Sequence, residues 1–323
     1  MNVLLTGGAG YIGSHAALEL IDKNHNVTII DSLVSGYEWI VPNKAIFHKC
    51  DIADKKLISK ILNSNKFDLV MHFAAFSKVG ESVSNPKKYY DNNYEKSKIF
   101  LDTCLENEVN SIIFSSSCSV YGNVTEQKKI AENCLTKPIN PYSDSKLMFE
   151  KYLLDLSSKK KLNAIILRYF NVAGADKKLR SGLMTNSENL IKAICEVATK
   201  KREKLIINGN TYKTFDGTAV RDFIHVSDLA EIHVLAGEKI LNEKKTDIFN
   251  CGYGEGFSIK QVVDCFNKIK KINYEYGPER KGDAEYSVAD TSKFNKNFKW
   301  SPKFNNLEII LKSAYDWEKK LKK

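Results

Sequence analysis

The stretch VLLTGGAGYIGSH, residues 3–15, decides the fold, because it joins an apolar strand, a glycine turn and the start of a helix. From Gly8 it reads G-x-G-x-x-G through Gly10 and Gly13, and from Gly7 it also reads G-x-x-G-x-x-G. Glycines at this spacing allow a tight turn and close approach of the backbone to a pyrophosphate, which faces the free N–H groups of the helix N-terminus. The stretch therefore predicts a dinucleotide-binding unit.

The next apolar run, NVTIID, ends in Asp31, 18 residues after Gly13. A carboxylate at this place can accept hydrogen bonds from both hydroxyls of an adenosine ribose, whereas it would repel a ribose 2′-phosphate. No arginine follows in SLVSG, residues 32–36. The pattern favours NAD over NADP as cofactor. The alternative is a structural turn followed by a chance aspartate.

Short apolar runs alternate with helical patterns over the first half of the chain. The predicted strands are residues 2–6, 26–31, 45–50, 68–75, 111–117 and 164–172, and the predicted helices begin near residues 11, 54, 87 and 141. This alternation predicts a parallel sheet with right-handed crossovers, and strands that are apolar on both faces predict helices on both sides.

After about residue 175 the pattern loosens, with helices expected at 187–200, 228–242, 258–270 and 306–321. We therefore predict an α/β protein with a Rossmann-type doubly wound parallel sheet and a smaller C-terminal α/β domain. The expected domains are an NAD-binding domain at 1–175 and a substrate domain at 176–323, with the chain returning to the first domain near 220–240.

Composition excludes several other classes of protein. The 323 residues carry a net charge of +10, but the lysines are spread along the chain, so neither a nucleic-acid partner nor a membrane partner is expected. Seven scattered cysteines without a C-x-x-C pair, and six histidines without a close pair, predict neither disulfides nor a metal site. With no signal peptide evident, a reducing cytoplasm fits best.

The segment NPYSDSK, residues 140–146, predicts a helix start that carries chemistry. Asn140 is a good N-cap, Pro141 suits the first helical position, and Lys146 lies one turn after Tyr142 on the same face. A lysine ammonium, a helix N-terminus and a positive nicotinamide ring would all lower the pKa of Tyr142 and make it a base near neutral pH. The alternative is a chance Y-x-x-x-K match on a surface turn.

The motifs TGGAGYIGSH, SSSCSVYG, PYSDSK, LRYFNVAGA and AVRDFIHVSDLA together resemble those of the extended short-chain dehydrogenase/reductase family, and more closely its UDP-glucose 4-epimerase branch. The resemblance runs nearly end to end. It implies tightly bound NAD that is not consumed: a tyrosine takes the proton of the sugar 4-hydroxyl while hydride leaves carbon 4, and the hydride returns to the other face of a 4-keto sugar. It implies that Tyr142 is the base and then the acid, that Lys146 binds the nicotinamide ribose and tunes Tyr142, and that Ser117 shares the hydrogen bond of the 4-hydroxyl.

The resemblance also implies the binding residues. Positions matching the family's NAD site are Gly7, Gly10, Tyr11, Ile12, Gly13, Asp31, Ser32, Ser35, Gly36, Asp51, Ile52, Phe73, Ala74, Ala75, Ser77, Asn93, Tyr142, Lys146 and Phe170. Positions matching its UDP-sugar site are Ser117, Tyr142, Asn171, Asn189, Leu190, Ile207, Asn208, Arg221, Arg280, Asp283 and Ser287. Two arginines suit a diphosphate, because a guanidinium makes forked, charge-assisted hydrogen bonds.

Three positions depart from many relatives. Asn208 stands where many relatives place an aromatic or other apolar residue against uracil, and Ser77 stands where relatives with GLKAVGES carry a lysine. Ser287 stands where some members carry a tyrosine, and a small residue there is associated in the family with room for an N-acetyl group. We therefore expect activity on UDP-GlcNAc and UDP-GalNAc as well as on the plain sugars.

Two other functions remain possible at this point. A nucleotide-sugar 4,6-dehydratase shares the Tyr/Lys pair, but its family carries an Asp-Glu pair where this chain has Cys118 and Ser119. A non-enzymatic dinucleotide sensor is the alternative from another class, although such proteins often lose the tyrosine or the lysine. Family members are often homodimers joined by helices such as 87–107 and 141–157, so a homodimer is expected.

Overall fold

The structure is a computed structural model that describes residues 1–124, 128–184, 189–279 and 284–321. The chain forms two compact units that alternate along the sequence. Unit 1 consists of Met1–Val120, Asn140–Arg168 and Ala230–Phe249, and unit 2 consists of Tyr121–Ile139, Tyr169–Leu229 and Asn250–Lys323. The predicted pair of domains, 1–175 and 176–323, stays a prediction.

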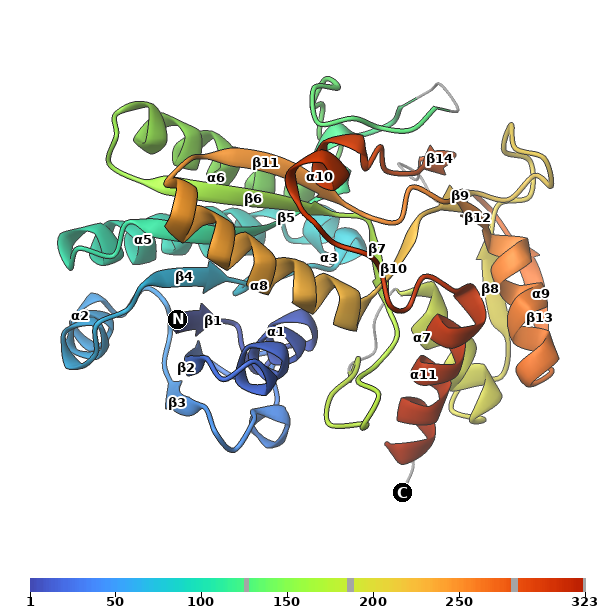
Figure 1. The fold of residues 1–323 in the computed structure, drawn as a ribbon. Coiled ribbons are helices and arrows are strands. Elements are labelled where there is room, and N and C mark those ends of the chain that lie inside the picture. The colour runs from blue at the N-terminus through green and yellow to red at the C-terminus, as the bar shows by residue number, and fades with distance from the viewer. Residues whose placement is uncertain (125–127, 185–188, 280–283, 322–323) are drawn as a thin grey trace. The chain divides into compact units, whose positions relative to one another are not determined.

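Unit 1 is built on a seven-stranded sheet (Figure 1). Its strands follow the order β11 (Asp247–Cys251), β6 (Asn163–Tyr169), β5 (Ser111–Ser117), β4 (Leu69–His72), β1 (Asn2–Thr6), β2 (Asn26–Asp31) and β3 (Ile46–Lys49). The pairs from β3 through β2, β1 and β4 to β5 are parallel. The predicted doubly wound parallel sheet is confirmed, and β11 is a strand that the sequence patterns did not reveal.

Helices cover both faces of this sheet. They are α1 (Tyr11–Asp22), α2 (Lys55–Ser64), α3 (Val79–Ser84), α4 (Pro86–Tyr90), a π-helical segment (Asp91–Lys96), α5 (Ser97–Glu106), α6 (Pro141–Ser158) and α8 (Val226–Glu243). Apolar side chains of α2, α5 and α6 share one core with the strands, whereas α8 crosses the opposite face (Figure 1). The single helix predicted to begin near residue 87 is in fact three consecutive helical segments, with the π turn in the middle.

The strand order reverses between β1 and β4, and ligands of doubly wound sheets bind at the carboxyl ends of the strands beside such a reversal. Gly7 follows β1 and Phe73 follows β4, and the Phe73 N–H donates to the Thr6 carbonyl at 3.0 Å. The glycine turn therefore begins at the edge of the sheet where such a ligand would bind.

Unit 2 contains short strands and four further helices. The helices are α7 (Leu190–Ala198), α9 (Ile259–Ile269), α10 (Ser292–Asn297) and α11 (Leu307–Lys320). The strands are β7 (Asn171–Ala173), β8 (Leu205–Asn208), β9 (Val220–Arg221), β10 (Phe223–His225), β12 (Phe257–Ser258), β13 (Tyr274–Gly277) and β14 (Tyr286–Ser287). They pair as β10–β7, β12–β9–β14 and β13–β8, and α7, α9 and α11 pack around one apolar core. The four helices predicted in the second half each lie within four residues of an observed helix.

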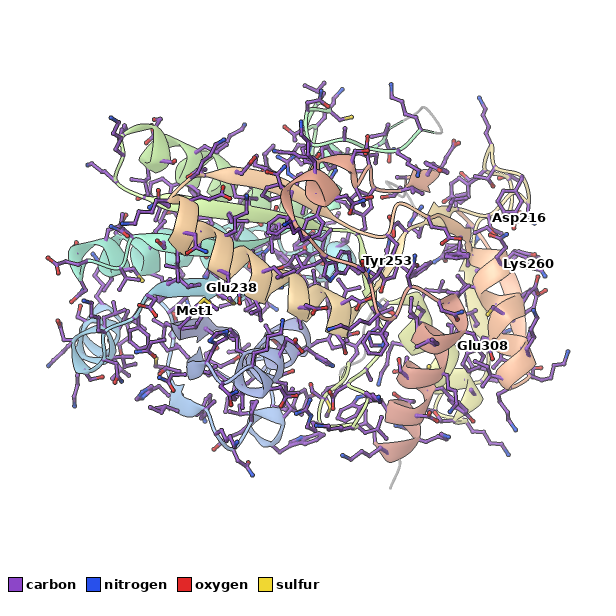
Figure 2. The ribbon with its side chains drawn as sticks, viewed as in Figure 1. Met1, Asp216, Glu238, Tyr253, Lys260 and Glu308 are labelled. Atoms are coloured by element: carbon purple, nitrogen blue, oxygen red, sulfur yellow. The ribbon has the colours of Figure 1, made fainter. Side chains whose placement is uncertain are left out.

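A buried carboxylate organises the loops of unit 2. Asp228 is fully buried and accepts hydrogen bonds from the Tyr253 hydroxyl at 2.5 Å and from the N–H groups of Lys303 and Phe304 at 3.1 and 3.0 Å. Figure 2 shows Tyr253 beside the start of α8. Because these donors come from two distant loops, Asp228 fixes both of them without a disulfide. All seven cysteines are free thiols.

Candidate active site

The glycine turn has the backbone geometry that its spacing predicts. Gly7 has a φ of +72°, and a Cβ at that position would lie 2.6 Å from the Ala74 backbone nitrogen. A Cβ on Gly13 would lie 2.3 Å from the Gly7 carbonyl oxygen. Gly10 precedes α1 without any side-chain cap, so the first N–H groups of that helix have no side-chain acceptor from the cap. The turn is therefore bare backbone suited to an anionic group.

Asp31 lies at the carboxyl end of β2 and is 8% exposed. One of its oxygens accepts from the Ala9 N–H at 3.0 Å and the other from the Leu33 N–H at 2.8 Å. Burial raises the pKa of this carboxyl, and the two backbone donors oppose that shift. Each oxygen keeps a free lone pair, so the side chain can still accept the two hydroxyls of a ribose.

A cavity of about 350 Å³ in unit 1 opens beside these residues. It is lined by eleven of the predicted cofactor residues, namely Gly7, Gly10, Asp31, Ser32, Ser35, Gly36, Asp51, Ile52, Phe73, Ala74 and Ala75. Tyr11, Ile12, Gly13, Ser77 and Asn93 belong to unit 1 but do not line it, and Phe170 belongs to unit 2. The assignment of all these residues to the cofactor stays a prediction.

Three residues of this region have roles that the sequence did not reveal. The Asn93 side-chain amide is buried and makes two hydrogen bonds to the Phe76 backbone. It accepts one from the Phe76 N–H at 2.8 Å and donates one to the Phe76 carbonyl at 2.9 Å. Lys96 forms an ion pair with Asp51, and Lys88 lies 4.1 Å over the Phe76 ring. Both lysines line the cavity, and each is paired with a carboxylate, Lys88 with Glu81 and Lys96 with Asp51.

Replacing Asp31 by serine is expected to weaken NAD binding about tenfold or more, because charge-assisted hydrogen bonds contribute roughly 1.5–3 kcal/mol. The same change removes the charge that opposes a 2′-phosphate, so the preference for NAD over NADP should narrow. Equilibrium fluorescence titration of both cofactors measures the two affinities. An unchanged ratio of the NAD and NADP affinities would contradict the role assigned to Asp31.

Tyr142 lies in the first turn of α6, as the cap residues predict. Asn140 accepts from the Ser143 N–H at 2.9 Å, and Pro141 occupies the first turn. The Tyr142 phenol is hydrogen-bonded to Ser117. The Ser117 hydroxyl oxygen also accepts hydrogen bonds from the backbone N–H and the hydroxyl of Ser119, at 3.2 and 2.9 Å. Because these two donors occupy both lone pairs of Ser117, its own O–H points to the Tyr142 oxygen as a donor. The sequence did not reveal that Ser119 takes part in this chain of hydrogen-bond donors.

Lys146 lies one turn further along α6 and is 3% exposed. Its ammonium donates to the Ser115 carbonyl at 2.7 Å and lies 4.9 Å over the Phe114 ring. Burial lowers the pKa of Lys146 to about 7, and the Glu150 carboxylate opposes that shift. The structure thus brings Ser117, Tyr142 and Lys146 together at the carboxyl end of β5.

The lowered pKa expected for Tyr142 includes the effect of a bound nicotinamide ring and stays a prediction. In this chain alone, burial raises the pKa of Tyr142 to about 12, and the hydrogen bond from Ser117 only partly opposes it. The protein therefore presents a protonated phenol, and a positive charge from a bound group would be needed to make it a base near neutral pH.

His72 is packed in the sheet rather than available for chemistry. Its two ring nitrogens are hydrogen-bonded to the Thr6 and Ser97 hydroxyls at 2.7 and 2.9 Å, and the residue is 2% exposed. Burial and the nearby Lys146 lower its pKa to about 3, so the ring is neutral. His72 is therefore a packed residue of β4. Among the described residues, no cluster of three metal-ligating side chains occurs, and no helix is long and apolar enough to cross a membrane.

Unit 2 contains a second cavity, of about 400 Å³, between α7 and β8. Six of the predicted substrate residues line it, namely Asn171, Asn189, Leu190, Ile207, Asn208 and Arg221. The Asn189 side chain caps α7 by accepting from the Lys192 N–H at 3.1 Å and donates to the Val172 carbonyl at 3.2 Å. Caps and backbone contacts thus fix its polar side chain at the cavity wall.

Three further residues predicted to bind the substrate are Ser287, Arg280 and Asp283. Ser287 is 9% exposed on β14, in register with Arg221 of β9, and does not line this cavity. Arg280 and Asp283 lie outside the described residues. The roles of all three stay predictions. Arg202 lines the cavity although the sequence did not mark it.

Comparison with known proteins identifies relatives over the full length of the chain. The UDP-glucose 4-epimerase of Lactobacillus helveticus is 40% identical over 322 residues, which cover 99% of this chain and 97% of that protein. The crystal structure of UDP-glucose-4-epimerase from Stenotrophomonas maltophila, with bound NAD and formylated UDP-arabinopyranose, has a TM-score of 0.96 at 34% identity and covers 100% and 99% of the two chains. The UDP-Glc/GlcNAc 4-epimerase from Campylobacter jejuni has a TM-score of 0.85 at 39% identity and covers 99% of each chain.

The sequence profile of the NAD dependent epimerase/dehydratase family matches residues 3–252. The glycine turn, Asp31 and the Tyr142–Lys146 pair all fall within this range, and NAD is the cofactor that the family uses. From its sequence and its fold, the chain belongs to the NAD dependent epimerase/dehydratase family.

Proposed function

We propose that this protein is a UDP-hexose 4-epimerase, an isomerase that interconverts UDP-glucose and UDP-galactose through a transient 4-keto sugar. The observation that carries the proposal is the donor chain from Ser119 through Ser117 to Tyr142 at the carboxyl end of β5, beside the dinucleotide cavity of the same unit. Full-length similarity to UDP-glucose 4-epimerases supports the same conclusion.

In the proposed reaction, NAD held by the residues of the unit 1 cavity would supply the hydride acceptor, and then the hydride donor, for carbon 4 of the sugar. Tyr142 accepts the proton of the 4-hydroxyl and later gives it back, while Ser117 donates to the phenol oxygen and stabilises its deprotonated form. Lys146 is a buried amine with a pKa of about 7, and its charged form would stabilise the tyrosinate that must be present before Tyr142 can accept the proton.

The unit 2 cavity is the proposed site for UDP. Arg221 offers a guanidinium to the diphosphate, and Asn171 and Asn189 offer amide donors and acceptors. Arg280 and Asp283 are proposed as further ligands on the strength of the sequence resemblance alone. Two cations and several amides are the chemistry that a nucleoside diphosphate requires.

One experiment tests the function directly. The purified protein is incubated with UDP-galactose, with UDP-GalNAc and with UDP-arabinose, without added NAD, and the products are identified by NMR. Formation of UDP-glucose supports the proposal. A 4-keto-6-deoxy product would favour the dehydratase, turnover without any conversion of UDP-galactose would favour a different nucleotide-sugar epimerase, and bound NAD without turnover of any UDP-sugar would favour a sensor.

We further propose that the N-acetylated sugars UDP-GlcNAc and UDP-GalNAc are substrates, supported by the small side chain of Ser287 and by a UDP-Glc/GlcNAc relative. Replacing Ser287 by tyrosine is expected to lower kcat/KM for UDP-GlcNAc by a factor of about 100, since overpacking costs roughly 1–3 kcal/mol, and to affect UDP-glucose less. Ser287→Ala is the control, because it should spare both sugars. Equal losses on both substrates, or no activity of the unchanged protein on UDP-GlcNAc, would contradict this proposal.

Two properties complete the proposal. A homodimer joined through α5 and α6 is supported by the family resemblance and is tested by light scattering, in which a monomer mass would contradict it.

A cytoplasmic location, with a role in galactose metabolism, is supported by the seven free cysteines, because disulfide-free thiols suit a reducing compartment. Localisation of the tagged protein in its own cells tests the second property.

A further inference from the structure

A second cation lies in the unit 2 cavity, and no motif in the sequence points to it. Arg202 follows the end of α7, its side chain is 43% exposed, and it lines the cavity together with Arg221. An arginine with that exposure usually extends into solvent and contributes little. Arg202 differs from that common case because its contacts fix the guanidinium in one place.

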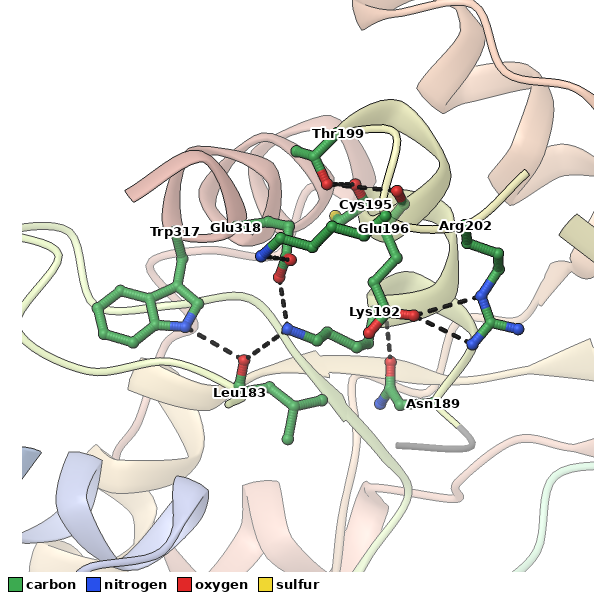
Figure 3. A network of polar contacts seen from close by, with 10 residues as sticks. Leu183, Asn189, Lys192, Cys195, Glu196, Thr199, Arg202, Trp317 and Glu318 are labelled. Atoms are coloured by element: carbon green, nitrogen blue, oxygen red, sulfur yellow. Dashed lines mark hydrogen bonds and ion pairs between the residues drawn. The ribbon is translucent and has the colours of Figure 1, made fainter. Parts of the chain in front are cut away.

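Glu196 holds Arg202 from the last turns of α7 (Figure 3). Its Oε2 atom accepts from Nε at 3.3 Å and from Nη2 at 3.0 Å of the Arg202 guanidinium, and its backbone carbonyl accepts the Arg202 N–H at 3.2 Å. The Glu196 side chain is only 9% exposed, so the partner is fixed within the unit. Among the described residues, no hydrogen bond is made by Nη1, so one edge and the face of the guanidinium remain available.

The ion pair with Glu196 determines which part of a nucleotide Arg202 is suited to bind. The carboxylate neutralises the guanidinium, which weakens its attraction for a diphosphate. It leaves the planar face intact, and a guanidinium plane stacks well on an aromatic ring even when its edge is hydrogen-bonded. Arg202 is therefore better suited to a nucleobase than to a phosphate.

The rest of the cavity wall supplies no exposed ring for that purpose. Among the described residues that line the cavity, the only aromatic side chain is Phe223, which is 4% exposed and belongs to the core. The wall near Arg202 is aliphatic, with Leu205, Ile206 and Ile259, and Asn208 ends β8 with an amide. A base in this cavity meets apolar side chains. Among the described lining residues, the planar cations are Arg202, which is held by Glu196, and Arg221, which donates from its Nη1 atom to the Val220 carbonyl at 2.9 Å.

We propose that Arg202, clamped by Glu196, is the nucleobase-stacking residue of this protein and replaces the aromatic contact that Asn208 cannot make. The inference rests on the proposed function, because it requires that the cavity binds a uridine nucleotide. It assigns binding of the base to Arg202 and leaves binding of the diphosphate to Arg221.

The test compares variants in binding and in turnover. Arg202→Met is expected to raise Kd for UDP, measured by calorimetry, and KM for UDP-galactose by about tenfold, which corresponds to about 1.4 kcal/mol and falls within the value of one stacked base. The value of kcat should stay within twofold, since the reacting carbon is not contacted. Arg202→Lys should behave like Arg202→Met, because it keeps the charge and loses the plane.

Three controls distinguish base stacking by Arg202 from a charge contact and from a purely structural role. Adding Asn208→Phe to Arg202→Met should restore most of the affinity, which a merely structural role of Arg202 would not allow. Inorganic pyrophosphate, which lacks a base, should bind the Arg202→Met variant and the unchanged protein equally well. Lys204→Met removes a neighbouring cation that pairs with exposed Glu275 at 2.7 Å outside the cavity, and it should change nothing.

Each result has one meaning. Full activity of Arg202→Lys, or equal losses of UDP and pyrophosphate binding in Arg202→Met, would show a charge contact with phosphate and overturn the inference. Unchanged UDP binding in Arg202→Met would overturn it as well, while the proposed function would stand if the unchanged protein turns over UDP-galactose. Failure of the unchanged protein to bind UDP would overturn both.

Discussion

Replacing Tyr142 by phenylalanine is expected to lower kcat for UDP-galactose by a factor of about 10²–10⁴, the usual contribution of a positioned acid–base group. The change removes one oxygen and keeps the ring, which packs edge-on against Tyr89 with the centroids 6.5 Å apart. Binding of NAD and of UDP should persist, because neither cavity loses a lining residue. Steady-state kinetics and calorimetry measure the two effects separately.

Tyr89→Phe is the matched control for Tyr142→Phe. It removes the neighbouring phenol, whose hydroxyl donates to Glu81 at 2.8 Å rather than to the Ser117 chain. Its kcat should stay within about twofold of the unchanged protein. If Tyr142→Phe kept more than a tenth of the activity, Tyr142 would not be the group that moves the proton.

Glu150→Ala is expected to lower the free energy of unfolding by about 3–5 kcal/mol, the cost of leaving a buried charge without its partner. Glu150 is 1% exposed on α6 and forms a forked pair with Arg168 of β6, at 3.0 Å from Nε and 2.6 Å from Nη2. Ser116 donates to the same carboxylate. The change therefore removes the carboxylate partner of Arg168, which is itself only 4% exposed.

Urea unfolding measures this loss, and two further variants test its cause. The double variant with Glu150→Leu and Arg168→Met should recover most of the stability, because apolar side chains of similar volume often replace a buried pair without loss. Asp155→Ala removes an exposed pair with Lys159 on the same helix and should cost less than about 1 kcal/mol. Equal losses from Glu150→Ala and Asp155→Ala would show that burial of the pair is unimportant.

The sequence predicts the sheet well because its signals are local. The apolar runs 2–6, 26–31 and 111–117 coincide with β1, β2 and β5, since a strand covered on both faces must be apolar throughout. Asp247–Cys251 did not stand out, because its apolar residues are few and its place beside β6 depends on the return of the chain through α8. The start of α6 was predictable because Asn140 and Pro141 carry cap chemistry in their own identities.

The site was less predictable than the fold wherever it depends on tertiary contacts. The residue types of Tyr142 and Lys146 indicated an acid–base pair, but the direction of the Tyr142 pKa depends on burial and on the hydrogen bond with Ser117, which no spacing reveals. Ser119 reaches Ser117 only because a turn at Cys118–Tyr121 folds it back. Arg202 joins the cavity only through its pair with Glu196, and arginine after a helix carries no motif.

The alternation of the two units along the chain has a consequence for synthesis on the ribosome. The sheet of unit 1 is incomplete until residues 230–249 have emerged, so β6 remains an open edge while most of unit 2 is being made. An exposed edge strand is a template for pairing with other chains. A nascent or truncated polypeptide that stops near residue 175 lacks β11, the neighbour of β6, and it should aggregate or recruit chaperones through the exposed edge of β6.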